Sequence, residues 1–181
     1  MSLAPTLLLS MPQLVDPNFA RVVVLLCEHA AEGAFGLIVN RPSDISAGDA
    51  VRLEPAVEAP NNLPLLIGGP VEPQRGWILT SQPPSDVEHR GVGAGLYLSA
   101  SPVFLRRVLT TRPLPRRTHV LAGYAGWGPG QLDAELAQSA WLTLPVELDL
   151  IFEIPAAAAW ETAIRRLGAD PHLLQTGQGV H

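Results

Sequence analysis

The chain has 181 residues, of which 47% are hydrophobic and only 16% are charged, so it can bury the core of one domain and is not disordered as a whole. All 12 basic residues are arginine and 17 residues are acidic, which leaves a net charge of −5. Without lysine the chain cannot carry a P-loop lysine, a Schiff-base lysine or a lysine-rich surface for nucleic acid.

Six short apolar runs predict strands. The first, Arg21–Glu28, is rich in valine and lacks alternation, which is typical of a strand buried on both faces. Ala34–Asn40 repeats this pattern after a turn that contains glycine, so the two runs are expected to form a hairpin. The other four runs are bounded by Gly, Pro or Ser: Leu65–Ile67, Trp77–Thr80, Gly95–Ser99 and His119–Tyr124.

Three helices are predicted from caps and from apolar residues at helical spacing. Ser101 is the expected N-cap of the first helix and Pro102 its first residue. A second helix is expected over Pro129–Ala140. The third covers Ala156–Leu167 and ends at Gly168, which favours helix termination.

The strands come early and the helices late, without regular alternation, which favours an α+β fold over a doubly wound one. We predict a single domain over residues 1–181, with a mixed, mostly antiparallel sheet of about six strands and three or four helices. Residues 1–5 and 169–181 are expected to be loosely ordered tails. Glu54–Pro64 and Gln82–Gly95, which are rich in proline, glycine or asparagine, are expected to be surface loops.

We expect a cytoplasmic protein with no membrane-spanning segment. The longest uncharged apolar run covers residues 22–27, far fewer than the ~20 residues of a membrane helix. A secretion signal would have a positive charge before its apolar stretch. The first arginine of this chain is Arg21, so no positive charge precedes Leu7–Leu9. Cys27 is the only cysteine, which excludes an intramolecular disulfide and suits a reducing compartment.

Three stretches combine glycine with aromatic or charged residues. They are Glu28–Pro42, Gly68–Trp77 and Gly123–Leu136, the last of which contains the string Gly-Tyr-Ala-Gly-Trp-Gly-Pro-Gly-Gln-Leu. In this order, and preceded by Met11-Pro12 and Asp16-Pro17-Asn18-Phe19, they resemble the YqgE/AlgH family of bacterial proteins from Leu9 to about Gly168.

The resemblance implies a single cytosolic α+β domain whose biochemical role is not established. Some family members are described as transcriptional regulators because of a link to alginate production. The family has no agreed catalytic or binding residues, so none is carried over to this chain. Gln178–His181 replaces the glycine-histidine-alanine ending that is common in the family, so no role is assigned to this tail.

One candidate site lies at the ends of the predicted hairpin. Glu28 and His29 end the first strand, and Asn40 and Arg41 end its partner, so the hairpin could gather an acid, an imidazole, an amide and a guanidinium. Neighbours in a strand point to opposite faces, so Glu28 and His29 are not expected to share one. The structural alternative is an ion pair of the Glu28–Arg41 type, with Asn40 as a turn residue.

A second candidate is the turn formed by Gly126, Trp127 and Gly128, between a strand and a helix. Free backbone N–H groups and the helix dipole could hold a phosphate or carboxylate there. The G-x-G-x-G spacing is not that of a dinucleotide site, and Asp133 and Glu135 would repel an anion. The favoured interpretation is therefore a tight turn that folds Trp127 onto the core.

Other reactive residues give weaker signals. Cys27 could be a nucleophile with His29 as its base, but its apolar neighbours favour a buried, unreactive thiol. The histidines lack metal-ligand spacing, so no metal or cofactor is expected. An arginine-rich stretch could form a DNA-contacting face through Arg106, Arg107, Arg112, Arg116 and Arg117. The acidic net charge and the lack of a helix-turn-helix pattern argue against DNA binding.

We therefore predict a binding or interaction protein without a catalytic site, whose partner is a small ligand or another protein and whose regulatory role is indirect. Glu28, Asn40, Arg41 and two glycine loops are expected to line one cleft. Two alternatives stay open. One is an enzyme that uses Glu28 or His29 beside Arg41, and the other is a transcriptional regulator that contacts DNA through the arginine face.

Overall fold

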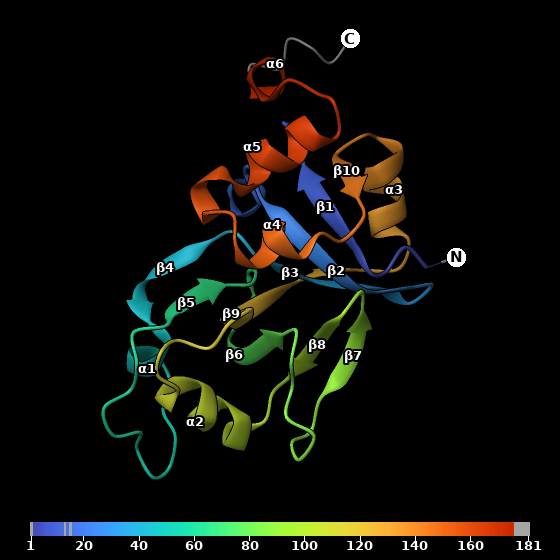
Figure 1. The fold of residues 1–181 in the computed structure, drawn as a ribbon. Helices are drawn as coiled ribbons and strands as arrows, with labels where there is room; N and C mark the ends of the chain where they lie inside the picture. The colour runs from blue at the N-terminus through green and yellow to red at the C-terminus, as the bar shows by residue number, and fades with distance from the viewer. Residues whose placement is uncertain (1, 13, 15, 176–181) are drawn as a thin grey trace.

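Strand β9 (Thr118–Trp127) joins the two halves of the sheet in the computed structural model, which describes residues 2–12, 14 and 16–175 (Figure 1). The C-terminal part of β9 pairs antiparallel with β3 (Gly33–Ile38). Its earlier part lies between β5 (Pro64–Ile67), which runs parallel to it, and β6 (Val71–Thr80), which runs antiparallel. The described residues thus form one mixed, curled sheet of ten strands.

The other strands extend the sheet on either side of β9. In one half, β2 (Val23–Ala30) forms a hairpin with β3, and β1 (Thr6–Ser10) lies between β2 and β10 (Trp141–Leu144). In the other half, β8 (Leu96–Ser99) lies between β6 and β7 (Arg90–Gly93). β4 (Pro42–Ser46) pairs with the outer edge of β5.

Two of the glycine-rich stretches cross where β9 changes partner. The Gly68 N–H donates to the carbonyl of Ala122 at 2.7 Å, which brings the start of the β5–β6 loop against β9. Gly123 has a φ of +76°, and a Cβ at this position would lie 2.3 Å from the carbonyl oxygen of Gly69. A Cβ on Gly69 would in turn lie 2.1 Å from the carbonyl carbon of Tyr124. Only glycine fits this crossing without movement of the backbone.

The helices cover three hydrophobic clusters on the two faces of the sheet (Figure 1). The inner cluster, between the sheet halves, is closed by α4 (Leu148–Phe152), α5 (Ala156–Arg166) and α6 (Pro171–Gln175). An outer cluster on the β1–β3 half packs under α3 (Gln131–Ala137) and the 3₁₀ helix Pro17–Phe19. The outer cluster on the other half packs under α1 (Ala47–Ala50) and α2 (Pro102–Thr110).

The prediction of an α+β domain with a mixed, mostly antiparallel sheet is confirmed, and each of the six predicted runs contributes to a strand. The expected number of about six strands is wrong, since β1, β4, β7 and β10 were missed. β4 contains a proline and polar residues, and β7 is Arg-Gly-Val-Gly, so neither has the composition of a strand. β1 and β10 are apolar runs of five and four residues, too short to distinguish strand from helix by periodicity.

The three predicted helices are present as α2, α3 and α5, but the expected total of three or four is too low for the described residues. The N-cap prediction for α2 is confirmed, because the Ser101 hydroxyl accepts from the Phe104 N–H at 3.2 Å. α3 is shorter than expected and begins after Gly130. The helices α1, α4 and α6 have only four or five residues, too few to show an apolar period.

Parts of the expected tails have defined contacts. The Leu3 N–H donates to His29 Nδ1 at 3.1 Å, and residues 171–175 form α6. Residues 176–181, which include the tail Gln178–His181, lie outside the described residues. No helix in the described part of the chain is long and apolar enough to cross a bilayer.

Candidate functional site

The four residues at the hairpin ends do not converge, contrary to expectation. Glu28 pairs with Phe35 and His29 with Ala34, so both lie next to the turn of the β2–β3 hairpin. Asn40 follows β3 at the far end, where its side chain contacts Val23 at the start of β2. The error lies in the hairpin geometry itself, because the end of one antiparallel strand lies beside the start of the other.

Asn40 and Arg41 anchor the segment that leads into β2. Asn40 Oδ1 accepts from the Val23 N–H at 2.9 Å, and Asn40 Nδ2 donates to the Arg21 carbonyl at 3.1 Å. The Arg41 guanidinium donates to the carbonyls of Asn18 and Ala20. Partial burial lowers the pKa of Arg41, and the nearby Asp16 carboxylate opposes this shift. Both side chains thus have local structural partners.

Glu28 and His29 face opposite sides of β2, as predicted. Glu28 forms an ion pair with Arg90 of β7, so the suggested Glu28–Arg41 pair is wrong. His29 lies on the other face, where Nε2 is 3.1 Å from Asp133 Oδ1 of α3. Because the Leu3 N–H donates to Nδ1, the proton of the neutral ring lies on Nε2 and is donated to Asp133. An enzyme built on these two residues is not favoured, since each is engaged by a different partner.

The Gly126–Gly128 turn packs as the structural interpretation predicted. Trp127 is 7% exposed and belongs to the outer cluster under α3. Its indole N–H donates to Glu135 Oε1 at 3.1 Å, and the same oxygen accepts from Trp141 Nε1 at 2.8 Å. The Gly128 N–H, which an anion would need, donates to Gln131 Oε1 at 3.0 Å. The turn therefore uses its polar groups within the protein.

The residues expected to line one cleft come together only in part, and the contacts between them are strand pairings. The second and third glycine stretches do meet, since Val71 pairs with Tyr124. The third also lies beside the hairpin turn, where Gly126 pairs with Phe35, the cross-strand partner of Glu28. Asn40 and Arg41 lie at the far end of the hairpin and take no part in this arrangement. The glycine stretches that stood out in the sequence thus meet where strands of the sheet pair with one another. The roles of the candidate residues in ligand binding stay a prediction.

The other reactive candidates also have structural explanations. Cys27 is 8% exposed, and this burial raises the pKa of its thiol to about 12. Two smaller effects oppose each other, since Arg90 lowers this pKa and Glu28 raises it. The prediction of a buried, unreactive thiol is therefore supported. Among the described residues, no three His, Cys, Asp or Glu side chains are grouped to hold a metal ion.

Most arginines of the suggested DNA-contacting face are engaged with the protein's own acceptors. Two of the five pair with carboxylates. Arg107 bonds both oxygen atoms of Asp86, at 2.8 and 2.6 Å, and Arg117 pairs with Glu153. Two others donate to backbone carbonyls. Within the described residues, only the side chain of Arg116 in this set has no partner. This partnering reduces the free positive charge that a phosphate backbone would meet, so the DNA alternative is not favoured.

The described structure has a groove of about 570 Å³ that sequence reasoning missed. We call it the α2 groove, because the start of α2 lines it together with residues 50–53. Its floor is the outer face of β5, β6 and β9. Apolar side chains that line it include Val51, Leu53, Leu65, Ile78, Leu105 and Val120. No motif marks these residues, since they come from five separate segments and have ordinary core composition.

The polar groups of the α2 groove are few. Arg52 is the only charged residue among the described residues that line it, and its side chain has no partner in the described part of the chain. Trp77 forms part of the wall and also lines an adjoining hollow of about 360 Å³. Its indole N–H is buried and has no acceptor among the described residues. Such an unpaired buried donor is rare and calls for an explanation.

Another hollow, of about 350 Å³, lies beside α4 and is lined by His119. His119 Nε2 donates to the Ile151 carbonyl at 2.6 Å, and the ring packs on Phe152 with centroids 4.9 Å apart. Burial lowers the pKa of His119, although the Ile151 carbonyl opposes the shift. These contacts tie β9 to α4 and account for the histidine without a ligand.

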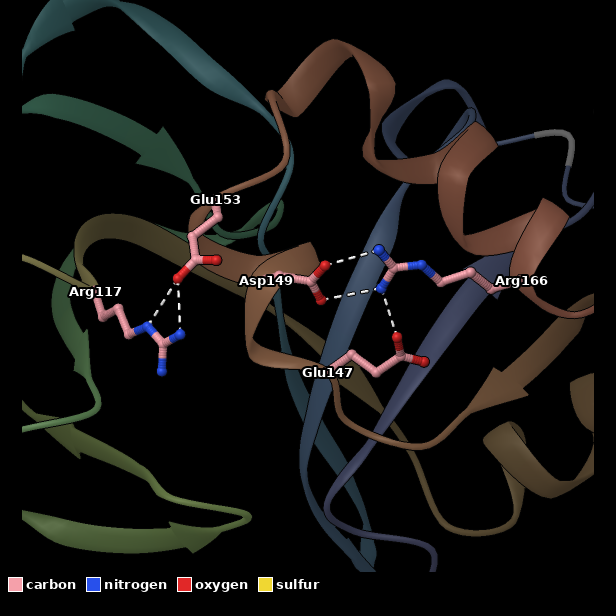
Figure 2. Close-up of polar contacts among 5 residues, drawn as sticks. All are labelled: Arg117, Glu147, Asp149, Glu153 and Arg166. Atoms are coloured by element: carbon pink, nitrogen blue, oxygen red, sulfur yellow. Dashed lines mark hydrogen bonds and ion pairs between the residues drawn. The ribbon is translucent and has the colours of Figure 1, made fainter.

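Ion pairs hold the two ends of α4, which lines this second hollow (Figure 2). Arg117 Nη2 at the edge of β9 lies 2.7 Å from Glu153 Oε1. Arg166 of α5 bonds both oxygen atoms of Asp149, at 3.0 and 2.7 Å, and also contacts Glu147. The hydrogen bonds from Arg166 lower the pKa of Asp149. Because its rim is cross-linked in this way, the second hollow is a weaker candidate for ligand entry than the α2 groove.

Comparison with known proteins places the chain in a family. The family model described as AlgH-like (DUF179) matches residues 7–172. A UPF0301 protein of Anaeromyxobacter dehalogenans is 43% identical over 188 residues, covering 98% of this chain and 94% of the relative. One of Myxococcus xanthus is 40% identical and covers 99% of both chains.

Solved structures agree with this assignment. The solution structure of the AlgH protein from Pseudomonas aeruginosa superposes with a TM-score of 0.77 at 34% identity, over 94% of this chain and 91% of that one. A protein of Corynebacterium diphtheriae has the same fold, with a TM-score of 0.69 at 22% identity, over 90% of this chain and 86% of that one. The chain therefore belongs to the AlgH-like UPF0301 family.

Proposed function

We propose that this protein is a non-catalytic binding protein of the cytoplasm that holds a small, largely apolar molecule in the α2 groove. The observation that carries the proposal is the groove itself. Its volume of about 570 Å³ lies within the range of about 300–1,000 Å³ that is typical of small-molecule sites. Its walls are mainly apolar side chains with a few polar groups, which is the usual composition of such sites.

The chemistry of the walls supports binding over catalysis. Arg52 can donate hydrogen bonds to a ligand through its guanidinium, but it offers no general acid or base. The Ser101 hydroxyl, which could serve as a nucleophile, already accepts the N–H of Phe104 as the N-cap of α2. None of the described residues that line the groove is His, Asp, Glu or Cys, and in the described structure the Ser101 hydroxyl is hydrogen-bonded to the Phe104 N–H and to no base.

The position of the groove also suits an indirect regulatory role. Its walls are the start of α2 and residues 50–53, so a bound molecule would change what these segments present at the surface. Val103 on α2 is 58% exposed and gives a protein partner an apolar contact there. Ligand occupancy would then control the binding of this protein partner, and a regulatory role of this kind needs no direct contact with DNA.

A thermal-shift screen against small apolar acids, amides, amines and alcohols tests this function. A molecule that binds only the folded state stabilises it by about 2.7 kcal/mol at a concentration of 100 times Kd. For a chain of this length, that corresponds to a rise in Tm of roughly 5–11 °C.

Two matched variants locate the binding. Gly76 lines the groove, and a Cβ on it would meet nothing within 4 Å, so Gly76→Leu is expected to place its side chain in the open space of the groove. Gly91→Leu is the control, since Gly91 also lies in a strand and its nearest neighbour to a Cβ is 3.9 Å away. The proposal predicts that the Tm rise is lost in Gly76→Leu and kept in Gly91→Leu. A rise that persists in Gly76→Leu, or a screen without any hit, contradicts it.

A further inference from the structure

We infer that residues 2–5 form a strap over the seam between the two halves of the sheet, and that protonation of His29 releases this strap. The seam is the line along which β2, from one half, faces β7, from the other (Figure 1). Its release would loosen the closure of the inner cluster at this end of the sheet. The inference does not depend on a ligand in the α2 groove.

Contacts on both sides place the strap on the seam. On the side of β2, the Leu3 N–H donates to His29 Nδ1 at 3.1 Å. On the side of β7, Pro5 lies so close to Gly93 that a Cβ on this glycine would be 2.9 Å from Pro5 Cγ. Between these two contacts, Ala4 packs partly against the outer cluster under α3. The strap therefore touches both halves of the sheet.

The hydrogen bond to the imidazole is an important attachment of the strap. The ladder between β1 and β2 begins at the pair Thr6–Leu26, so the strap lies before the first backbone pair. Directly across the seam, Glu28 pairs with Arg90, and both of these side chains are about half exposed. An exposed ion pair contributes little to stability. Closure of the seam thus depends on the strap as well as on this pair.

His29 can hold the strap only while its ring is neutral. The side chain is 6% exposed and contacts both the strap and α3. In the neutral ring, Nδ1 accepts from the Leu3 N–H, and the proton on Nε2 is donated to Asp133 Oδ1, 3.1 Å away. A second proton lies on Nδ1 and points at another donor, so the bond to the strap is lost. The bond to Asp133 becomes charge-assisted and keeps the ring in place.

The charged groups around His29 set the direction of the switch. On α3, the Asp133 carboxylate favours the protonated ring, while Glu135 is engaged by two indole N–H groups. On β3, the cross-strand partner is an uncharged alanine, and Glu28 of β2 faces the other side of the sheet. Glu32, in the hairpin turn, is exposed. Acid therefore favours a ring that keeps its bond to α3 and gives up the strap.

NMR of ¹⁵N-labelled full-length protein tests the switch. The backbone order parameters of Leu3 and Ala4 and the ring signals of His29 are followed from about pH 8 to about pH 5, the range in which histidine changes its charge. We expect the order parameters to fall from about 0.85, the value of a rigid backbone, to below about 0.6 as the ring is protonated. The order parameter of Leu8 in β1 should stay high, because the strap opens without the sheet.

Two asparagine substitutions separate the latch from a general effect of acid. In His29→Asn, the side-chain oxygen replaces Nδ1 as the acceptor and does not titrate, so the strap should stay ordered at about pH 5. His172→Asn is the matched control, because His172 is exposed on α6, away from the seam (Figure 1). This variant should release the strap as the unsubstituted protein does.

Asp133→Asn tests the direction of the effect. The new amide oxygen still accepts the Nε2 proton but adds no negative charge beside the ring, so release should require a lower pH. The Asp133 side chain is 64% exposed, which favours retention of the fold. The inference is wrong if His29 titrates while Leu3 stays ordered, or if the ring does not titrate above about pH 5. It is also wrong if His29→Asn releases the strap unchanged, or if Asp133→Asn does not lower the pH of release.

Discussion

Replacing Gly123 by alanine tests why β9 can change partners in the middle of the sheet. The new Cβ would lie 2.3 Å from the Gly69 carbonyl oxygen and 3.2 Å from that of Val71, on a backbone with a φ of +76°. The left-handed conformation costs an L-residue about 1–2 kcal/mol, and forcing an extra carbon into a packed site costs about 1–3 kcal/mol more. Gly123→Ala should therefore lower the free energy of unfolding by about 2–5 kcal/mol, or Tm by roughly 4–20 °C.

Gly130→Ala is the matched control. Gly130 has nearly the same φ, +73°, but a Cβ there would meet nothing within 4 Å. Gly130→Ala should therefore lower the free energy of unfolding only by the conformational cost of about 1–2 kcal/mol. Urea unfolding followed by circular dichroism gives both values with the same method. If the two substitutions cost the same, close contact between the glycine stretches does not determine this crossing, and the reasoning is refuted.

Three further predictions concern other parts of the fold. Cys27 should resist iodoacetamide at pH 8 in the native protein and react quickly in urea, because burial raises its pKa to about 12; rapid labelling of the native protein would show that the thiol is exposed. Glu135→Leu should lower the unfolding free energy by about 2–3 kcal/mol, since two buried indole N–H groups lose their acceptor, whereas a change below about 0.5 kcal/mol would show that water replaces it. Arg166→Gln should lower the unfolding free energy by at most about 1 kcal/mol at pH 7, because the Arg166–Asp149 pair is partly exposed and water screens it. Because Arg166 lowers the pKa of Asp149, the stabilisation is present above the unfolded value of about 3.9 and is lost as the pH falls through the folded pKa. The unfolding free energies of the two proteins, measured in urea, should therefore converge as the pH is lowered below that folded pKa.

Local signals in the sequence predicted most of the central elements. Ser101 and Pro102 marked the start of α2, and the valine-rich run before Glu28 marked β2, because capping and burial act through neighbouring residues. The β4 strand escaped detection for the opposite reason. Its residues have no strand preference, and only pairing with β5 makes them a strand.

The candidate site was harder to predict than the fold. The hairpin residues stood out because they are polar and follow apolar runs, yet Asn40 and Arg41 satisfy nearby backbone groups. The α2 groove gave no signal, since Val51, Ile78 and Leu105 look like core residues until the distances between their segments are known. An unpaired indole such as that of Trp77 is also invisible in a sequence, because the absence of a partner is a property of the packed structure.

The location of a bound molecule tests the central claim most directly. In protein labelled at leucine and valine methyl groups, a hit from the thermal-shift screen should perturb the methyl signals of Val51, Leu53, Leu105 and Val120 on the walls of the α2 groove. The signals of Leu114 and Leu150, which line the hollow beside α4, should stay unchanged. Perturbations that gather at Leu114 and Leu150, or that spare the α2 groove, would contradict the account.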